Sequence, residues 1–423
     1  GLQDISPSRE QFLFKAENYD NFIDSPIQIG CHETDGFNYR GKSHELAFYG
    51  EAAPHKRNLK EDIKTIVEHI GDYMGDIPYE KYVFITHLVQ GLYGGLEHKN
   101  STALQFCSRG FIKDKEYLNW LCLVSHEYFH TWNVKRIRPK GFGPFDYKNQ
   151  FDSSMLWLAE GLTSFMDELF VYQCGLASTE EYLEMQTKNL NRYFSTLGRR
   201  FHSLETSGFN AWDVLYKQNE NSFNSSVSYY LKGGISFFLL NILLVKNDSS
   251  IKDFIQKLWG WYKANPAEGM VKEDIYKIIK DLGGDTALQS FEEFIETTIE
   301  LPLSSYLEDM GLSIEWESEN ELGFGFTYEV KNSRVFVTRV PIDSSAHKFG
   351  INVSDEVIAI NGLRVDEKSI KDLLSNLKAN TLYDFTLSRL GKLHCIKAMG
   401  ENLPKKIKSI KVIDKKKVDQ FLR

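Results

Sequence analysis

The sequence predicts an α+β multidomain protein, in which a mostly α domain with a small β portion at its front is followed by a compact β-rich domain. Three observations support this prediction. The chain has 423 residues, which is too long for one ordinary domain. Between about residues 55 and 300, apolar residues recur at intervals of three and four, the spacing of amphipathic helices. After about residue 310 the pattern changes to short strand-like segments.

The elements follow in this order along the chain. Residues 1–50 are short extended segments separated by turn residues, and they predict a front β segment. Residues 51–305 form the helical domain, with the clearest periodicity in the stretches LKEDIKTIVEHIGDYMG and IKDFIQKLWGWYKAN. Residues 306–400 combine strand-like segments such as RVFVTRV with one helix, SIKDLLSNLK. Residues 401–423 form a basic C-terminal tail.

The composition is that of a soluble globular protein, with 42% apolar and 26% charged residues. The net charge of -8 is unevenly placed, because residues 401–423 carry eight Lys and Arg against three Asp and Glu. Nothing upstream resembles a nucleic-acid footprint, so we expect no nucleic-acid partner. We expect the basic end to be a solvated tail or an edge strand.

The cysteines and the apolar runs exclude further classes. The five cysteines are scattered, odd in number and without CxxC spacing, so they predict neither a disulfide framework nor a cysteine metal site. The longest apolar run, residues 233–245, contains Asn241 and is shorter than the roughly 20 residues of a membrane span, so we expect no transmembrane segment. No signal peptide opens the sequence, but it starts at Gly1, and a cytoplasmic or a periplasmic location stays open.

The stretch SHEYFHTWNVKRIRP, residues 125–139, contains an HExxH motif. On a helix His126 and His130 lie one turn apart on the same face and can present two imidazoles to one metal ion. Glu127 then lies beside the metal, where a general base is needed. The alternative is an ordinary buried helix in which the HExxH motif occurs by chance and binds no metal. The apolar run LNWLCLV before it places these polar groups in the core, where they are costly without a metal or partners.

A catalytic zinc site takes three protein ligands, so a third ligand is needed from another element. The stretch LWLAEGLTSFMDEL, residues 156–169, supplies Glu160 between apolar residues at core spacing. A buried carboxylate there needs a cation. Taken alone, Glu160 is equally compatible with an exposed or salt-bridged glutamate, and the HExxH motif is what favours zinc.

Two further stretches have residues that such a site requires. YGGLEHKNS, residues 93–101, is a glycine-containing strand or turn with a lone acid, Glu97, and its backbone is suited to lie along a bound peptide. SVSYYLKGG, residues 226–234, opens a helix with two adjacent tyrosines, one of which is expected to donate a hydrogen bond to an oxyanion. The alternative for residues 93–101 is a turn without a binding role. The alternative for residues 226–234 is a pair of tyrosines that only pack in the core.

With these four motifs in this order, the chain resembles the glycyl aminopeptidase family of gluzincin zinc metallopeptidases. These are relatives of aminopeptidase N in which a thermolysin-like catalytic domain is followed by a PDZ domain. The resemblance implies one Zn²⁺ per chain, bound by His126, His130 and Glu160, with Glu127 as the base. It also implies that Glu97 accepts the substrate's α-amino group, that Gly94 and Gly95 lie along the substrate, and that Tyr230 rather than Tyr229 stabilises the oxyanion.

The resemblance also implies which domain of the family each part of the chain corresponds to. Residues 1–50 correspond to the end of an N-terminal β domain, 51–305 to the catalytic domain and 306–400 to PDZ. LGFGF at 322–326 corresponds to the carboxylate-binding loop of PDZ, and such grooves bind extended peptide ends by strand addition. The alternative is a structural module with an unused groove. The gap of 29 residues between His130 and Glu160 is longer than in aminopeptidase N.

The function predicted from this resemblance is a zinc-dependent aminopeptidase that removes the first residue, Gly or Ala by preference, from peptides with a free N-terminus. The size preference rests on the resemblance alone. One alternative is a thermolysin-type endopeptidase, which needs the same zinc and base but not Glu97. The other is a PDZ peptide-binding scaffold with a vestigial peptidase domain.

Overall fold

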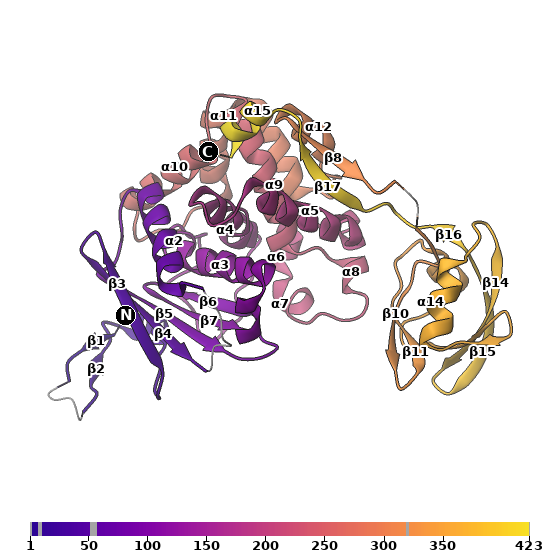
Figure 1. Cartoon of the computed structure of the whole chain (residues 1–423). Helices are drawn as coiled ribbons and strands as arrows, with labels where there is room; N and C mark the ends of the chain where they lie inside the picture. The colour runs from indigo at the N-terminus through magenta and orange to yellow at the C-terminus, as the bar shows by residue number, and fades with distance from the viewer. Residues whose placement is uncertain (1, 7–10, 51–56, 319–320, 423) are drawn as a thin grey trace.

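The computed structural model describes residues 2–6, 11–50, 57–318 and 321–422. Figure 1 shows a large part that contains most of the helices and, beside it, a smaller β-rich part. Each part has its own apolar core: one is built from residues 46–312 and 407–422, the other from residues 324–398. The mixed helix and sheet architecture in several units is therefore confirmed. No helix among the described residues is long and apolar enough to cross a lipid bilayer.

The larger part contains a five-stranded sheet at its front. Its strands, in spatial order, are β3 (Glu33–Tyr39), β4 (Lys42–Tyr49), β5 (Lys81–Leu88), β7 (Ser101–Phe106) and β6 (Gly94–His98). The three central strands are parallel, and α2 (Leu59–Met74) provides the crossover from β4 to β5. Strand β6 runs antiparallel to β7 at the edge. Its other edge pairs with no described strand.

Helices cover the sheet and fill the rest of the larger core (Figure 1). They are α3 (Asp114–Phe129), the π-helical turn η2 (Trp157–Gly161), α4 (Leu162–Gln173), α5 (Thr179–Ser195), α6 (Leu204–Phe209), α7 (Ala211–Val214), α8 (Ser222–Ser225), α9 (Tyr229–Val245), α10 (Ile251–Ala264), α11 (Lys272–Glu296) and α12 (Leu303–Asp309). Two short 3₁₀ turns, η1 (Ser108–Ile112) and η3 (Leu197–Arg200), lie between them. Helix α9 is apolar around most of its circumference, which is why it lies at the centre of the core.

A pair of glycines lets two of these elements cross closely. A Cβ atom on Gly161, at the end of η2, would lie 2.8 Å from the Cα atom of Gly233 in α9, and a Cβ atom on Gly233 would lie 2.9 Å from the Cα atom of Gly161. Only glycine fits at both positions of this contact. The close crossing brings the residue before Gly161 and the first turn of α9 to the same side of the molecule.

The smaller part is a β-rich unit around its own core. Its main sheet has the order β10 (Thr327–Lys331), β11 (Arg334–Arg339), β12 (Glu356–Ile360), β14 (Leu382–Arg389) and β15 (Lys392–Met399), with β13 (Leu363–Arg364) paired to β12. Strands β9 (Leu322–Gly323) and β16 (Glu401–Asn402) form a separate pair, and the helices are α13 (Ser345–Phe349) and α14 (Glu367–Ser375).

The predicted boundary at residue 50 does not separate two domains. Strands β3 and β4 belong to the same sheet as β5, β6 and β7, and Leu46 is fully buried in the larger core. Among the described residues before position 51, the elements outside this sheet are the small hairpin of β1 (Gln3–Asp4) and β2 (Phe14–Lys15) and the short helix α1 (Tyr19–Ile23). The prediction failed because a strand pattern does not reveal which strands pair.

The predictions for the second boundary and for the C-terminal end also need correction. Leu303, Leu307 and Leu312 lie in the larger core, so that core extends beyond residue 305. Of the two forms expected for the basic end, the structure shows a strand and not a solvated tail, because β17 (Ile407–Val412) pairs with β8 (Leu312–Trp316) of the larger part in a two-stranded sheet. Helix α15 (Lys415–Phe421) then packs its apolar face into the same core. The many lysines lie on the exposed faces of these elements and conceal the few apolar residues that anchor them.

Candidate active site

Helix α3 presents the two histidines of the HExxH motif to one point. The Nε2 atoms of His126 and His130 each lie 3.3 Å from the same oxygen of Glu160. The two rings are 4.7 Å apart and nearly perpendicular. The three ligand atoms all lie within 4.8 Å of one another, and all three side chains are at most 14% exposed. This convergence is what a shared metal ion requires.

The other ring nitrogen of each histidine has a partner of its own. His126 Nδ1 lies 2.7 Å from Asp167 Oδ2, and His130 Nδ1 lies 2.6 Å from the backbone oxygen of Asn133. Hydrogen bonds of this kind fix the ring orientation and leave Nε2 free to bind a metal. Sequence reasoning missed both partners. A signal for Asp167 was present, since it follows Glu160 by seven residues, two helical turns on the same face.

Glu160 lies on the π-helical turn η2, which widens the helix at this point. The Asn133 side chain supports the turn, because its Nδ2 atom donates to the backbone oxygens of Leu158 and Ala159 at 2.9 and 3.1 Å. Burial acts to raise the pKa of Glu160, but the charge and hydrogen bonds of His130 and His126 outweigh it and hold this pKa well below its usual range. Glu160 is therefore an anion between two imidazoles.

Glu127 lies beside that cluster and beneath the edge strand, with a carboxylate oxygen within 4.8 Å of a ring nitrogen of His130. It is 4% exposed, and its Oε2 atom has no hydrogen-bond partner. Burial raises its pKa to about 7. The close approach to β6 depends on Gly95, because a Cβ atom there would lie 2.3 Å from Glu127 Oε1. A buried carboxylate with an unused oxygen and a pKa near neutrality has the properties of a proton carrier.

Glu97 approaches the cluster from the edge strand. Carboxylate oxygens of Glu97 and Glu127 and a ring nitrogen of His130 all lie within 4.8 Å of one another. Gly94 has a φ of +154°, which favours glycine at the start of the strand. Strand β6 therefore carries a carboxylate next to the histidine cluster and exposes an unpaired backbone edge beside it.

The two tyrosines occupy different environments. The ring of Tyr230 lies 6.2 Å from the ring of His126 and lines the same cleft. Tyr229 is 1% exposed, and its hydroxyl lies 3.4 Å from that of Tyr216. Burial and the negative charge of Glu160 raise the pKa of Tyr230 far above its usual value, so its phenol keeps its proton and can donate it in a hydrogen bond.

One cleft of about 1080 Å³ brings the three clustered side chains, Glu127, Glu97 and Tyr230 together, and Tyr229 does not line it. The predicted site residues that line it are Gly94, Gly95, Glu97, His126, Glu127, His130, Glu160 and Tyr230. They come from β6, α3 with its C-terminal cap, η2 and α9, which are separated widely in the sequence. The volume exceeds what one amino acid needs and suits a short peptide.

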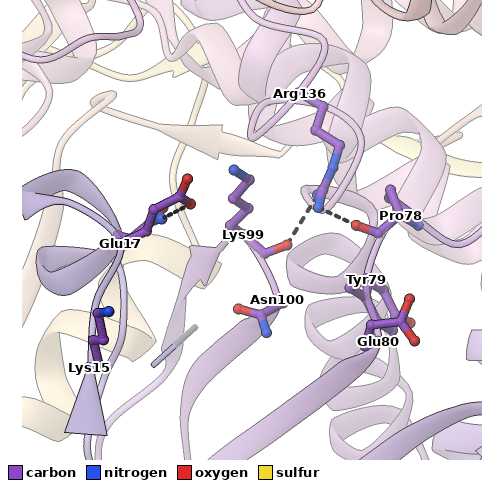
Figure 2. A pocket seen from close by; sticks show the side chains of 9 residues that line it. Lys15, Glu17, Pro78, Tyr79, Glu80, Lys99, Asn100 and Arg136 are labelled. Carbon is purple, nitrogen blue, oxygen red and sulfur yellow. Dashed lines mark hydrogen bonds between the residues drawn. The ribbon is translucent and has the colours of Figure 1, made fainter. Parts of the chain in front are cut away.

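The basic residues that follow His130 do not line this cleft. Lys135 pairs with Asp24 at 2.7 Å, and Arg138 donates to the backbone oxygen of Ala267 at 3.2 Å. Arg136 is 5% exposed and lies beside a second, polar cavity of about 420 Å³ (Figure 2).

The guanidinium of Arg136 binds backbone rather than carboxylates. It donates to the backbone oxygens of Pro78 and Lys99 at 2.6 and 3.1 Å (Figure 2), and also to that of Thr131 at 2.6 Å. Lys99 lies two residues after Glu97, and Thr131 directly follows His130. Arg136 therefore ties the end of the edge strand to the end of the histidine helix, which the sequence did not reveal.

Comparison with known proteins agrees with this geometry. Residues 119–235 match the family model described as M61 glycyl aminopeptidase. The predicted family is confirmed for this segment. The M61 segment contains both histidines, Glu127, Glu160 and Tyr230, while Glu97 lies before it. The comparison with curated proteins gave no match.

A solved structure matches the whole chain. It is an aminopeptidase N family protein from Idiomarina loihiensis, with a TM-score of 0.93, 26% sequence identity, and coverage of 100% of this chain and 76% of that chain. An M1 zinc metallopeptidase from Deinococcus radiodurans is similar at a TM-score of 0.45 and 17% identity, over 65% of this chain and 54% of that one. The M61 segment and the Idiomarina structure together support a peptidase, that is, a hydrolase that acts on peptides.

Proposed function

We propose that the chain is a zinc-dependent aminopeptidase that removes the first residue from peptides with a free N-terminus. The convergence of His126, His130 and Glu160 beside two further carboxylates, in a cleft of peptide size, is the observation that carries this proposal. A preference for Gly or Ala comes from the family resemblance and is part of the proposal.

The chemistry of the ligand set fits zinc. Two imidazoles and one carboxylate are a common set for catalytic zinc, which takes three protein ligands and keeps one position open. Both histidines have hydrogen-bond acceptors on their second nitrogen, as zinc ligands do. The buried, unpartnered oxygen of Glu127 beside them is explained if a ligand or water occupies that space. Zinc supplies a Lewis acid for a carbonyl oxygen and lowers the pKa of water.

Residues of the chain then carry out proton transfer, oxyanion stabilisation and substrate binding. Glu127 takes a proton from the attacking water at its free carboxylate oxygen and returns it to the leaving amine. Tyr230 donates its phenol hydrogen to the oxygen that becomes negative in the transition state. The unpaired edge of β6 binds the substrate backbone as an added strand.

Glu97 distinguishes this proposal from a thermolysin-type endopeptidase. In an exopeptidase the carboxylate of Glu97 accepts the ammonium group of the substrate and so fixes the first peptide bond at the zinc ligands. Its position within 4.8 Å of Glu127 and His130 favours this role, because the distance leaves room for one residue at most. An endopeptidase has no use for a carboxylate at that point, since it would meet an uncharged backbone.

The smaller domain enters the proposal as a PDZ-like module. Gly325, in the predicted carboxylate-binding loop, has a φ of +83°, and the backbone oxygen of Phe324 accepts a hydrogen bond from Ala346 at 2.7 Å. We propose that a peptide end binds beside this loop. Binding of a C-terminal peptide to the chain, lost when the loop is altered by Phe326→Ala, tests this part.

The test of the main proposal is hydrolysis of aminoacyl chromogenic amides by the zinc-loaded protein. We expect chelator-sensitive release from glycyl and alanyl amides, and no release when the amino group is acetylated. Glu127→Gln is expected to abolish the activity and Glu97→Gln to reduce kcat/KM by at least 10²-fold, while Glu180→Gln, an exposed acid on α5, serves as the matched control. Equal cleavage of acetylated and free substrates would favour an endopeptidase instead.

A further inference from the structure

One wall of the cleft is a segment with few core contacts of its own. It runs from residue 211 to residue 228 and includes α7 and α8. Residues 216–221 are all exposed. The segment nevertheless contributes Leu215, Tyr216, Gln218 and Ser228 to the lining of the cleft. Because few of its residues are buried, bonds to other segments have to hold this wall, and some of these bonds, such as that of Trp212 to the backbone oxygen of Phe151, lie within the larger domain.

The side chain of Asn224 anchors the wall at its far end. Asn224 is 9% exposed, and its Nδ2 atom donates to the backbone oxygen of Val340 at 2.9 Å. Its Oδ1 atom accepts from the backbone nitrogen of Ile342, also at 2.9 Å. The second hydrogen of Nδ2 is used within the wall, by Asn221 Oδ1 at 2.9 Å. The amide therefore joins the wall to two backbone groups of the smaller domain.

These two bonds stand out among the contacts between the two parts. Within the described residues, they are the only hydrogen bonds that join residues 322–400 to residues before 318. The guanidinium of Arg339 lies 4.2 Å from the centre of the Phe223 ring, which is again in the wall. The ion pair of Arg200 with Asp343, at 3.8 Å, is solvent-exposed and contributes little. The hydrogen bonds of the smaller domain to the larger one therefore go to the wall, and its exposed ion pair with Arg200 lies outside the wall.

The other end of the wall leads directly to the tyrosine pair. Ser226 packs against η3, where a Cβ atom on Gly198 would lie 2.1 Å from the Ser226 nitrogen. Helix α9 begins three residues later, and the rings of Tyr229 and Tyr230 stack with centroids 4.9 Å apart. The hydroxyl of Tyr216, in the wall, lies 3.4 Å from that of Tyr229. Movement of the wall therefore changes the lining next to Tyr230.

We infer that Asn224 is a positioning residue, through which the 322–400 domain holds this wall and sets the affinity of the cleft for peptides. The inference rests on the proposed function. An aminoacyl amide fills only the part of the cleft near Glu97 and the histidines, whereas a longer peptide has to use the rest of the 1080 Å³, including Leu215 and Tyr216. Loosening the wall is therefore expected to affect long substrates more than short ones.

The first readout is amide hydrogen exchange, which does not depend on activity. In the full chain, Asn224→Ala is expected to accelerate exchange in residues 211–226 by at least tenfold and to leave α3 and β14 unchanged, because local opening follows the loss of local bonds. Asn224→Asp, which keeps the acceptor for Ile342 but loses the donor to Val340, is expected to act in the same direction. Arg200→Ala, which breaks only the exposed ion pair with Asp343, is the control. It is expected to change the exchange rate neither in residues 211–226 nor in α3 and β14.

The second readout is kinetic. For a tetrapeptide, Asn224→Ala is expected to raise KM about tenfold, while kcat for a glycyl amide stays within twofold of wild type. Unchanged exchange in the wall overturns the inference, as does an equal loss of kcat on both substrates with KM unaltered. If the wild-type protein hydrolyses neither substrate, the proposed function fails, and the exchange measurement still decides whether Asn224 holds the wall.

Discussion

Gly95→Ala offers a sharp test of the site, because the substitution adds one methyl group at a point where the structure leaves no room. The new Cβ atom would lie 2.3 Å from Glu127 Oε1 and 2.5 Å from the Cγ and Cδ atoms of that side chain. Ordinary contacts of a Cβ atom begin at 3.4 Å. Either the Glu127 carboxylate or the β6 backbone that carries Glu97 has to move by about 1 Å, and a displacement of this size costs about 10² in rate, or about 2.7 kcal/mol of transition-state stabilisation.

The assay is kcat for hydrolysis of a glycyl or alanyl amide, with zinc content and melting temperature measured on the same preparation. The three atoms nearest to the new Cβ atom all belong to Glu127 and none to a predicted zinc ligand, so zinc content is expected to stay normal. The control is Gly260→Ala in helix α10, where no heavy atom lies within 4 Å of the new Cβ atom and full activity is expected. If Gly95→Ala retains kcat within twofold, the assignment of Glu127 as the base beneath β6 is refuted.

Three further predictions concern the same site. Asp167→Asn weakens the hydrogen bond to His126 and is expected to lower zinc affinity by 10- to 100-fold in a chelator competition. Tyr230→Phe is expected to reduce kcat by about 10²-fold or more while KM and zinc content stay unchanged. The pKa of Glu127 is about 7 in the folded protein against 4.5 ordinarily, so between these values the folded state binds more protons than the unfolded state, and the metal-free protein loses stability as the pH rises. Glu127→Gln is therefore expected to be more stable than the metal-free wild type by up to about 3 kcal/mol at pH 8, with no difference below about pH 4.5, in denaturant unfolding.

The residues that meet in the cleft were predictable because each lies in a short stretch with its own chemical signature. HExxH places two imidazoles on one helical face, and a lone glutamate in an apolar helix or beside two glycines is conspicuous in the sequence. The structure brings all of these residues to one cleft. Their chemical roles are predictions that the experiments above test.

The supporting contacts were not predictable, because they depend on how distant segments approach. Nothing in the sequence around Arg136 indicates that its partners are the backbone oxygens of three separate loops, since every residue offers the same acceptor. The hydrogen bond of His130 Nδ1 to the Asn133 carbonyl was equally unpredictable, because this acceptor is also a backbone oxygen. The prediction that residues 1–50 lie outside the larger domain failed for the same reason. The strand pattern of residues 33–49 does not reveal which other strand they pair with.

The return of the chain to the larger core has a consequence for how the protein is made. On α15, Val418 and Phe421 are buried, as is Leu422 directly after it, and the ring of Phe421 packs against that of Phe238 in the central helix. During synthesis these residues emerge after the whole of the smaller domain, so the larger domain lacks part of its core until the chain has been made beyond that domain. The smaller domain, whose core lies within one continuous stretch, is therefore expected to fold first, and its compact form shortens the effective distance that β17 has to span to meet β8.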